Sequence, residues 1–441
     1  MTDLSAGLVR VIGVGALSSA LEIGADRAPR AAGDLSKLLG KAGCEVVELG
    51  AIDTPDAAVA AGRKLAENHC HAVALAVASW FEDYLALDLL EECGIPVLLW
   101  SLPGMETGAL CGVQQLTACL TQLGAPFACV YGDLTEGVGL PKAGSFLRAA
   151  SLKHRLRRAR VGLAGHHVGG MTEVSVNEIA LKKAIGPRIV PLDLPRLLEG
   201  ADRIDGALAK AEWDMLAARA TRCDVSEQAG LDSMRVYVAI KELVASHGLD
   251  ALTIGCYPHL MGRVCLAASL LADQDVPLAC EGDANGAVGQ LMLTLLSGRP
   301  THNTDWLEPR DDGTVMFTHC GSGSLSLAER PDQVSLGPVR LMDRGACALF
   351  PSRPGPVTLV NLIPREQRYQ MAVLTGQAVT TEMVFPGNPL RVRFRPNIVD
   401  LIDWIHEEGI GHHWMAGYGH LSAELRAWSR LTDDSVRYIE A

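Results

Sequence analysis

The sequence predicts an α/β protein in which two doubly wound parallel-sheet domains precede a β-rich, barrel-like C-terminal domain. Short apolar segments alternate with helical segments up to about residue 312, the pattern of successive βαβ units. Glycine is frequent (45 residues) and aromatic residues are few (5%), a composition that suits many strand-to-helix turns. Past Gly313, strand-like segments follow one another with few helices. We expect domains at residues 1–158, 159–312 and 313–441.

The first domain contains five apolar segments that are bounded by Gly, Pro or Asp and predict strands. These segments are residues 8–14, 45–49, 72–78, 96–99 and 127–131. Helical segments such as 56–67 and 84–92 lie between them. Thr54 followed by Pro55 is typical of a helix start, with an N-cap residue before a proline at the first helical position. This order predicts a parallel sheet with helices on both faces.

The second domain opens at Arg160 with a strand that leads into a glycine turn. Its later segments predict helices at 178–184, 207–220 and 227–246 and strands at 188–192 and 251–257. We therefore expect a second α/β domain of similar build. In the third domain, segments 315–318, 357–362, 370–374 and 390–394 predict strands. A helix at 398–408, a last strand at 412–416 and a closing helix at 421–431 complete it.

The stretch from Pro277 to Trp306 is the centre of the sequence. An apolar strand delivers Glu281 and Asp283 at its end, a helix over 287–296 follows, and a short polar segment ends on Asp305. Acids at the ends of neighbouring strands converge at one edge of an α/β sheet, where ligands bind. The alternative, of about equal weight from spacing alone, is that Glu281 and Asp283 only cap the following helix.

Composition narrows the classes of partner. The net charge of −12 disfavours nucleic acid, because binding a phosphate backbone needs a basic surface. The N-terminus lacks the basic start of a signal peptide, and no apolar run reaches membrane-spanning length, so we expect no membrane association. The 12 cysteines form no CxxC pair, which favours reduced, mostly buried thiols. We therefore expect a cytoplasmic protein.

Three segments supply candidate histidines. In Gly411-His412-His413-Trp414, neighbouring strand residues point to opposite faces, so at most one of the two histidines should face a given site. His166-His167 is a rival pair that spacing cannot rank against it. His319 precedes a glycine-rich turn and is a candidate ligand or hydrogen-bond donor to a sugar, although an ordinary loop histidine is the favoured interpretation.

Two further features bear on the ligand. Trp80 stands at the end of a predicted strand, where an exposed indole could stack on a sugar, although core packing is the default. Gly13 and Gly15 lack the third glycine of a dinucleotide fingerprint, because Ser18 occupies its position. Carboxylates and an imidazole from different strands suit an octahedral Mn²⁺- or Mg²⁺-like site with open positions, and two carboxylates also suit an acid–base pair.

At these residues the chain resembles the L-fucose isomerase and L-arabinose isomerase superfamily of metal-dependent aldose–ketose isomerases. The specific match is Cys280-Glu281-Gly-Asp283-Ala-Asn285-Gly286-Ala287, with Asp305 at an offset of 305 − 281 = 24, the spacing of the two metal-binding acids of fucose isomerases. Thr318-His319-Cys320-Gly321 and Gly411-His412-His413 support it. The chain is shorter than either enzyme, and its N-terminal turn lacks the arginine-bearing pattern of fucose isomerases.

The resemblance implies a site and a reaction. Glu281, Asp305 and His413 would bind a divalent metal, usually Mn²⁺, with Mg²⁺ or Co²⁺ as alternatives. Glu281 and Asp305 would also serve as the acid–base pair that converts an open-chain sugar or sugar derivative through a cis-enediol. The resemblance further implies a homo-oligomer in which a neighbouring subunit completes each site. The residues expected to contact substrate are His319, His412, Asn285 and, from the adjacent subunit, Trp80.

Alternatives remain open from the sequence. One is a sugar-binding paralogue that keeps the fold without turnover, and another is a metal-dependent sugar epimerase or aldolase. The sugar could be neutral, acidic or sulfonated. Arg391, Arg393 and Arg395 alternate along a strand-like segment and are candidates for an anion contact, but a solvated sheet face explains the alternation more simply.

Overall fold

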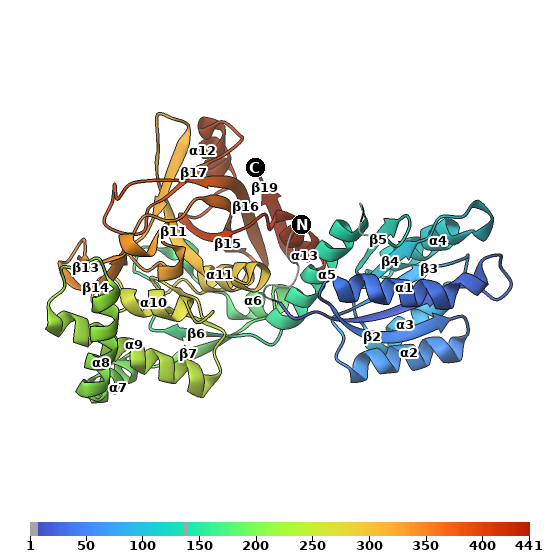
Figure 1. Ribbon diagram of the computed structural model, residues 1–441, viewed down its shortest axis with the longest axis horizontal. Coiled ribbons are helices and arrows are strands. Elements are labelled where there is room, and N and C mark those ends of the chain that lie inside the picture. Colours follow the sequence, from blue (N-terminus) through green and yellow to red (C-terminus); the bar gives the residue numbers. More distant parts are fainter. Residues whose placement is uncertain (1–7, 136, 138) are drawn as a thin grey trace. The chain divides into compact units, whose positions relative to one another are not determined.

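The computed structural model describes residues 8–135, 137 and 139–441. The chain separates into two compact units (Figure 1). Unit 1 comprises Met1–Arg155 and Ala423–Asp433, and unit 2 comprises Leu156–Ser422 and Asp434–Ala441. The residues of the expected second and third domains thus lie almost entirely in unit 2, and the three-domain boundaries stay a prediction.

Unit 1 is built on a five-stranded parallel sheet with the order β2-β1-β3-β4-β5. The strands are β1 (Val11–Leu17), β2 (Glu45–Ile52), β3 (Ala72–Val77), β4 (Val97–Ser101) and β5 (Phe127–Tyr131). The helices are α1 (Ala28–Lys41), α2 (Pro55–Glu67), α3 (Tyr84–Cys93), α4 (Ala109–Gln122), α5 (Gly139–Leu156) and α13 (Ser422–Ser429). Side chains of α2, α3 and α4 form one apolar cluster with the sheet. The predicted doubly wound domain is confirmed here, with β1 beginning three residues later than expected.

Local signals explain the boundaries of α2. The Thr54 hydroxyl accepts a hydrogen bond from the Ala57 amide at 3.3 Å, and Pro55 occupies the first turn, as the sequence predicts. Gly62 allows α2 to pack closely against α3, because a Cβ at this position would lie 2.4 Å from the carbonyl oxygen of Leu89 in α3. A larger residue there would push α2 and α3 apart.

Unit 2 contains a second parallel sheet, with the order β10-β9-β6-β7. Its strands are β6 (Arg160–Ala164), β7 (Arg188–Leu192), β9 (Ala251–Ile254) and β10 (Leu278–Ala279). The helices around it are α6 (Glu178–Ala184), α7 (Leu194–Arg203), α8 (Gly206–Arg219), α9 (Glu227–His247), α10 (Cys265–Ala272) and α11 (Ala284–Ser297). This sheet confirms the second α/β part of the predicted fold class.

A largely antiparallel sheet forms the other half of unit 2, with the order β15-β18-β11-β12-β17-β16-β19. An additional β15–β16 pairing joins its two sides, so the sheet is ring-like, as the predicted barrel-like domain requires. The strands are β11 (Thr301–Pro309), β12 (Thr314–Thr318), β15 (Gly355–Arg365), β16 (Arg368–Val379), β17 (Leu390–Arg393), β18 (His413–Tyr418) and β19 (Val436–Glu440). Helix α12 (Ile398–Glu407) precedes β18.

Three smaller features complete the fold. Strands β14 (Arg344–Leu349), β13 (Ser335–Val339) and β8 (Arg222–Cys223) form a separate small sheet in that order. The expectation that the strand at 412–416 is the last one is wrong, because β19 follows it and pairs in parallel with β16. None of the helices in the described part of the chain combines the length and the apolar character needed to cross a membrane.

Helix α11 joins the two halves of unit 2. It contacts β6, β9 and β10 of the parallel sheet and also β11, β15 and β18 of the ring-like sheet. Twelve of its 14 residues are buried, as expected for a helix that is covered on all sides. Gly298, in the left-handed conformation, ends the helix as its position in the sequence predicts. The N-terminus of α11 therefore lies where both sheets deliver side chains.

Candidate active site

Glu281 and Asp305, the two acids that the sequence singles out, lie close together, but the elements that carry them differ from those expected. Glu281 follows β10 of the parallel sheet, whereas Asp305 lies in the middle of β11 of the ring-like sheet. The expectation that they stand at the ends of neighbouring strands is therefore wrong, because the polar segment 301–305 is itself a strand. Asp305 faces His413 directly across the β11–β18 pair. Helix α11 runs between the two acids and links the sheets that carry them.

The backbone at Glu281 is strained. Glu281 has φ +66°, and Gly282 has φ +75°, so two successive residues adopt a left-handed conformation. The turn is held by a hydrogen bond from the Val168 amide to the Glu281 carbonyl at 3.2 Å. A non-glycine residue kept in this conformation costs of the order of 1 kcal/mol, and such strain concentrates at functional sites. The turn sets the direction in which the Glu281 carboxylate leaves the strand end.

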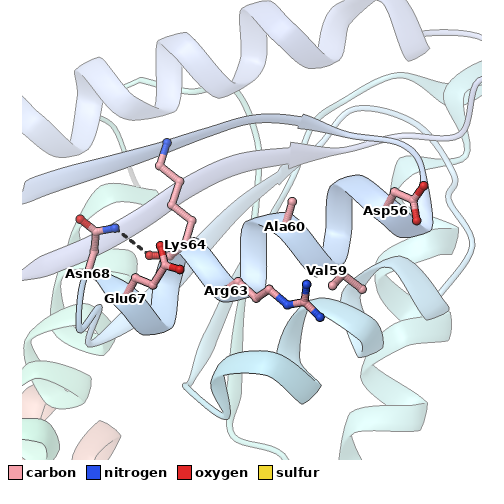
Figure 2. Close-up of a pocket in the computed structure, with 7 residues that line it drawn as sticks. All are labelled: Asp56, Val59, Ala60, Arg63, Lys64, Glu67 and Asn68. Atoms are coloured by element: carbon pink, nitrogen blue, oxygen red, sulfur yellow. Dashed lines mark hydrogen bonds between the residues drawn. The ribbon is translucent and has the colours of Figure 1, made fainter.

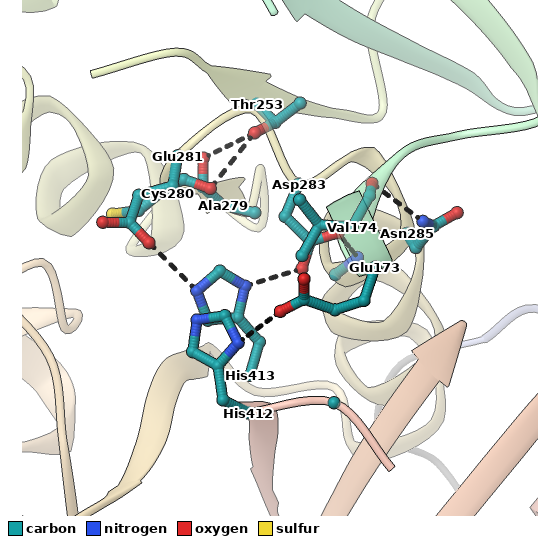
Figure 3. A network of polar contacts seen from close by, with 12 residues as sticks. Glu173, Val174, Thr253, Ala279, Cys280, Glu281, Asp283, Asn285, His412 and His413 are labelled. Atoms are coloured by element: carbon teal, nitrogen blue, oxygen red, sulfur yellow. Dashed lines mark hydrogen bonds and ion pairs between the residues drawn. The ribbon is translucent and has the colours of Figure 1, made fainter. Parts of the chain in front are cut away.

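His413 is the common partner of the acids (Figure 3). Its Nε2 lies 3.1 Å from Glu281 Oε2 and 3.8 Å from Asp305 Oδ1. Its Nδ1 donates to Asp283 Oδ2 at 2.8 Å. Asp283 is also the N-cap of α11, because its Oδ1 accepts from the Gly286 amide at 2.8 Å. The helix-cap alternative is thus correct for Asp283 and not for Glu281.

His412 lies beside His413, with the two ring centroids 4.2 Å apart. His412 precedes β18, which begins at His413, so the alternation of strand side chains does not apply to it. The expectation that at most one of the two histidines faces the site is therefore wrong. His412 Nδ1 donates to Glu173 Oε1 at 2.7 Å. Both imidazoles thus have a carboxylate partner.

His319 is buried, not an ordinary loop histidine. Its Nε2 lies 3.8 Å from Glu281 Oε2 and 3.9 Å from Asp305 Oδ2. Its ring centroid is 5.9 Å from that of His413. His319 therefore lies within reach of both carboxylates, as His413 does.

The rival pair His166-His167 does not join these ligand groups among the described residues. His166 Nδ1 donates to the His167 carbonyl at 2.6 Å, and His167 Nε2 lies 2.9 Å from the Ser175 hydroxyl. The pair packs instead against the Glu281 turn, because a Cβ on Gly282 would lie 2.4 Å from the His166 carbonyl oxygen. The His166-His167 pair therefore supports the strained turn at Glu281 and Gly282.

The donor set fits a divalent cation. Two groups have ligand atoms within 4.8 Å of one another, Asp305 with His319 and His413, and Glu281 with His412 and His413. His413 is shared, and the expected trio of Glu281, Asp305 and His413 is divided between the two groups. Adjacent ligands of a six-coordinate ion bound at about 2.1 Å are about 3 Å apart, close to the His413–Glu281 separation.

A buried polar atom without a hydrogen-bond partner also fits a bound cation. Asp305 Oδ1 is buried and has no hydrogen-bond partner among the described residues. Buried polar atoms without a partner are rare in folded proteins, and an ion is one of the groups that satisfies them. Carboxylate oxygens with imidazole nitrogens are a donor set that suits Mn²⁺. The residues present therefore fit a metal of this class.

The electrostatics of the site tie the histidines to the acids. Burial raises the pKa of Glu281, but hydrogen bonds and charge from His319 and His413 outweigh it and hold that pKa well below its usual range. Burial lowers the pKa of His413, but Asp283 and Glu281 outweigh it and raise the pKa to about 10. Burial also lowers the pKa of His319, and Asp305 outweighs it, so this pKa stands well above its ordinary value. Protonated imidazoles thus face ionised carboxylates.

Asn285, an expected substrate contact, is fully buried in the first turn of α11. Its amide nitrogen donates to the Val174 carbonyl at 3.1 Å, and its amide oxygen accepts from the Tyr369 hydroxyl at 3.1 Å. Both polar atoms are therefore already used within the protein. A substrate contact through Asn285 would have to replace one of these bonds.

Trp80 lies in unit 1, after β3 at the carboxyl end of the parallel sheet. Its indole is half-buried, and Nε1 donates to Gln115 Oε1 at 3.1 Å. Its backbone amide donates to the Thr107 carbonyl, and its carbonyl accepts from the Ser19 amide. Trp80 thus joins three loops at the edge where α/β sheets bind ligands.

A separate depression follows helix α2 on the surface of unit 1 (Figure 2). It is lined by Asp56, Val59, Ala60, Arg63, Lys64, Glu67 and Asn68. Arg63 pairs with Glu92 at 3.2 Å, and Lys64 donates to the Glu48 carbonyl at 2.8 Å. Because these cations already have partners and the depression is open, it offers no site comparable with the cluster in unit 2.

The contacts that Asp283 and Glu173 make with the histidines of the site could not be predicted from the sequence. Asp283 carries a signal, since it stands at an N-cap position, but nothing local indicates that its second oxygen binds His413. Glu173 carries no signal, because it lies in a short 3-10 turn after β6 and meets His412 across 239 positions of the chain.

Comparison with known proteins shows that the sequence of this chain is similar to those of sugar isomerases. It is 24% identical over 369 residues to the sulfoquinovose isomerase of Alkalicoccus urumqiensis, a match covering 80% of this chain and 82% of that protein. It is 23% identical over 360 residues to the sulfoquinovose isomerase of Priestia megaterium, covering 78% and 80%. It is 26% identical over 360 residues to that of Clostridium sp. (strain MSTE9), covering 75% and 78%. No protein-family model matches the chain.

Proposed function

We propose that this chain is a metal-dependent aldose–ketose isomerase that acts on an open-chain sugar through a cis-enediol. The curated relatives are named as sugar isomerases, which supports the predicted enzyme class. The observation that carries the proposal is the convergence of Glu281, His413 and Asp305, with His413 Nε2 3.1 Å and 3.8 Å from the two acids. These residues come from three separate segments that the sequence resemblance had already selected.

Glu281, Asp305, His413 and His319 are the residues that would hold the metal, with Mn²⁺ as the first candidate. When bound, the cation supplies a Lewis acid that stabilises negative charge developing on the oxygen atoms of the sugar. Asp283 accepts a hydrogen bond from His413 Nδ1, so Nε2 is the nitrogen that would give up its proton and hold a metal. Asp305 Oδ1 is a buried acceptor without a partner and is equally available.

The two acids also perform the proton transfer in this proposal. One carboxylate removes the proton from C2 of the aldose and returns it to C1, while the hydroxyl proton of O2 is transferred to O1 with the help of the other carboxylate, which yields the ketose. The lowered pKa of Glu281 keeps this carboxylate ionised at neutral pH, as a metal ligand must be. In this proposal the enediol lies between the buried His319 and the half-exposed His412. His319 would shield it from water, and the side of His412 would stay open for the sugar to enter.

A sulfonated hexose is the first substrate to test, because each of the relatives compared is named for sulfoquinovose. Of the alternating arginines, Arg391 and Arg393 both pair with Asp312, at 2.5 Å and 3.4 Å, near the surface. This arrangement agrees with the solvated sheet face that the sequence favours.

The first experiment is proton NMR in D₂O on the metal-stripped protein, with a panel of aldoses that includes sulfoquinovose, before and after Mn²⁺ is added. We expect ketose to form only with metal, with deuterium entering next to the carbonyl. A product with an inverted centre would indicate an epimerase, and cleavage would indicate an aldolase. Tight Mn²⁺ binding without exchange on any sugar would favour a sugar-binding paralogue.

We further propose that the protein is a homo-oligomer in which Trp80 of a neighbouring subunit completes the site. Support comes from the loops beside Trp80, where Leu21 and Met105 are 91% and 96% exposed. Such large exposed apolar side chains are typical of a surface that a partner covers. Mixed oligomers of Trp80→Ala and Glu281→Gln subunits test this, because a shared site regains activity that neither variant has alone. No regain in verified mixed oligomers would place each site within one subunit.

A further inference from the structure

Two carboxylate–imidazole pairs lie side by side in the site (Figure 3). Asp283 accepts from His413 Nδ1 at 2.8 Å, and Glu173 accepts from His412 Nδ1 at 2.7 Å. In the first pair, the other ring nitrogen is occupied, since His413 Nε2 lies 3.1 Å from Glu281. In the second pair, Nε2 of His412 has no hydrogen-bond partner in the described part of the chain. The ring of His412 is thus fixed on one side and open on the other.

Glu173 is held in place by a chain of contacts that begins in α11. It belongs to the short 3-10 helix η3 (Thr172–Val174), and the Val174 carbonyl accepts from the buried Asn285 amide at 3.1 Å. Asn285 is fixed in turn by the Tyr369 hydroxyl. On the other side, a Cβ on Gly411 would lie 3.7 Å from Glu173 Cγ, so the Glu173 side chain passes close to the backbone before His412. Such anchoring favours one position of the carboxylate.

The Asp283–His413 pair is buried, whereas the Glu173–His412 pair is exposed and therefore accessible to a ligand. The Asp283 and His413 side chains are 5% and 2% exposed, whereas those of Glu173 and His412 are 39% and 44% exposed. The inner pair therefore belongs to the floor of the site and the outer pair to its open side. His412 thus offers a ring nitrogen on the exposed side, within 4.8 Å of ligand atoms of Glu281 and His413.

We infer that Glu173 is a positioning residue that directs Nε2 of His412 toward a hydroxyl group of the sugar. Because Nδ1 carries the proton donated to Glu173, the Nε2 of a neutral imidazole is an acceptor, which matches the hydroxyl donors of a carbohydrate. His412 contacts substrate in this inference and is not a metal ligand. Asn285 contributes indirectly, through Val174 and Glu173.

The inference rests on the proposed isomerase function and adds a residue to it. Its competitor is visible in the same geometry, because the His412 ring also lies close enough to Glu281 and His413 to be a metal ligand. The two alternatives differ in what Glu173 controls. A positioning role for substrate changes KM, whereas a role in orienting a ligand changes the affinity for Mn²⁺.

The test compares Glu173→Ala and Glu173→Gln with the matched control Glu199→Gln, which alters a surface Glu–Arg pair at 3.2 Å on α7. For the sugar that wild type converts, we expect Glu173→Ala to raise KM about five- to tenfold, the size of one hydrogen bond, with kcat within about twofold. Glutamine retains an acceptor for Nδ1, so Glu173→Gln should restore KM to within about twofold of wild type. The affinity for Mn²⁺, followed by electron paramagnetic resonance, should stay within about twofold in all three variants.

An unchanged KM in Glu173→Ala would overturn the inference, and so would a tenfold loss of Mn²⁺ affinity, which would make His412 a ligand. A Glu173→Gln variant as impaired as Glu173→Ala would overturn it as well.

A second measurement separates this inference from the proposed function. Nitrogen-15 NMR of histidine-labelled protein, with the signals assigned by a His412→Asn variant, reports which nitrogen of His412 carries the proton. We expect the Nδ1–H form in wild type and Glu173→Gln and its loss in Glu173→Ala. If wild type converted no sugar, the proposed function would fail, whereas identical His412 spectra in wild type and Glu173→Ala would refute the positioning role itself.

Discussion

Asp283 binds the N-terminus of α11 with one carboxylate oxygen and His413 with the other. Oδ1 accepts from the Gly286 amide and Oδ2 from His413 Nδ1, both at 2.8 Å. One side chain therefore fixes both the start of the helix and the tautomer of the imidazole. A turn of the imidazole would break its bond to the side chain that caps the helix, so β18 and α11 together hold His413 Nε2 toward Glu281.

The first prediction separates these two roles of Asp283. Serine is also a good N-cap but is too short to reach His413, so Asp283→Ser should retain the cap and release the imidazole. We expect its affinity for Mn²⁺ to fall about 10- to 100-fold. Asp283→Ala loses the cap as well and should unfold about 1 kcal/mol more easily than Asp283→Ser. Metal titration and urea denaturation measure the two effects, and equal Mn²⁺ affinity in wild type and Asp283→Ser would contradict the role assigned to Oδ2.

The second prediction concerns the dependence of metal affinity on pH. The pKa of His413 is raised to about 10 from an ordinary value of 6.5, so the metal-free protein carries a proton there at neutral pH. A metal must displace that proton, and its affinity should therefore increase with pH, by about tenfold per unit for a single proton. Mn²⁺ titrations at pH 6, 7 and 8 measure this slope. Calorimetry in two buffers of different ionisation enthalpy counts the protons released, and an affinity that is flat with pH would contradict the prediction.

The third prediction tests the carboxylate of Glu281. Glu281→Gln keeps the size and the backbone conformation of the side chain but removes the charge that faces His413 and His319. We expect Mn²⁺ affinity to fall at least about tenfold and turnover about a hundredfold or more, since a first-row metal prefers a charged oxygen ligand. Asp312→Asn is the matched control, because it neutralises an exposed acid that pairs with Arg391. Metal-dependent isomerisation that was equal in the two variants would remove Glu281 from the site.

The fourth prediction concerns the helix between the two sheets of unit 2. Leu293 of α11 is fully buried and lies beside Gly417 of β18, where a Cβ would approach the Leu293 Cβ to 3.0 Å. Leu293→Ala should lower the free energy of unfolding by about 2 to 5 kcal/mol, because it leaves a cavity in a close-packed interior. Leu208→Ala on α8, where the residue is 47% exposed, should cost less than about 1 kcal/mol. Urea denaturation of both variants checks the difference, and similar losses would show that α11 does not hold the sheets together.

Much of the local structure could be predicted because it depends on neighbours in the chain. The apolar segment 127–131 predicted β5 with the observed bounds, and the segment boundaries 178–184 and 188–192 coincide with those of α6 and β7. Thr54 and Gly298 marked helix ends correctly, because capping is a property of a few consecutive residues. The polar strand β11 was missed, because Thr301, Asn303 and Asp305 give no apolar alternation, although their strand is paired on both sides.

Local sequence patterns and the family resemblance were enough to predict the α/β class with a β-rich, barrel-like C-terminal part, to select Glu281 and Asp305, and to name the histidines to be considered. Only long-range packing shows that His413 meets the acids, that His166 and His167 join neither ligand group among the described residues, and that His412 lies beside His413 and hydrogen-bonds to Glu173. The physical reason is the range of the contacts. Hydrophobic period and helix capping act over a few residues, whereas the pairs that build the site span 130 positions for Asp283 and His413 and 239 for Glu173 and His412, and only strand register and burial bring them together.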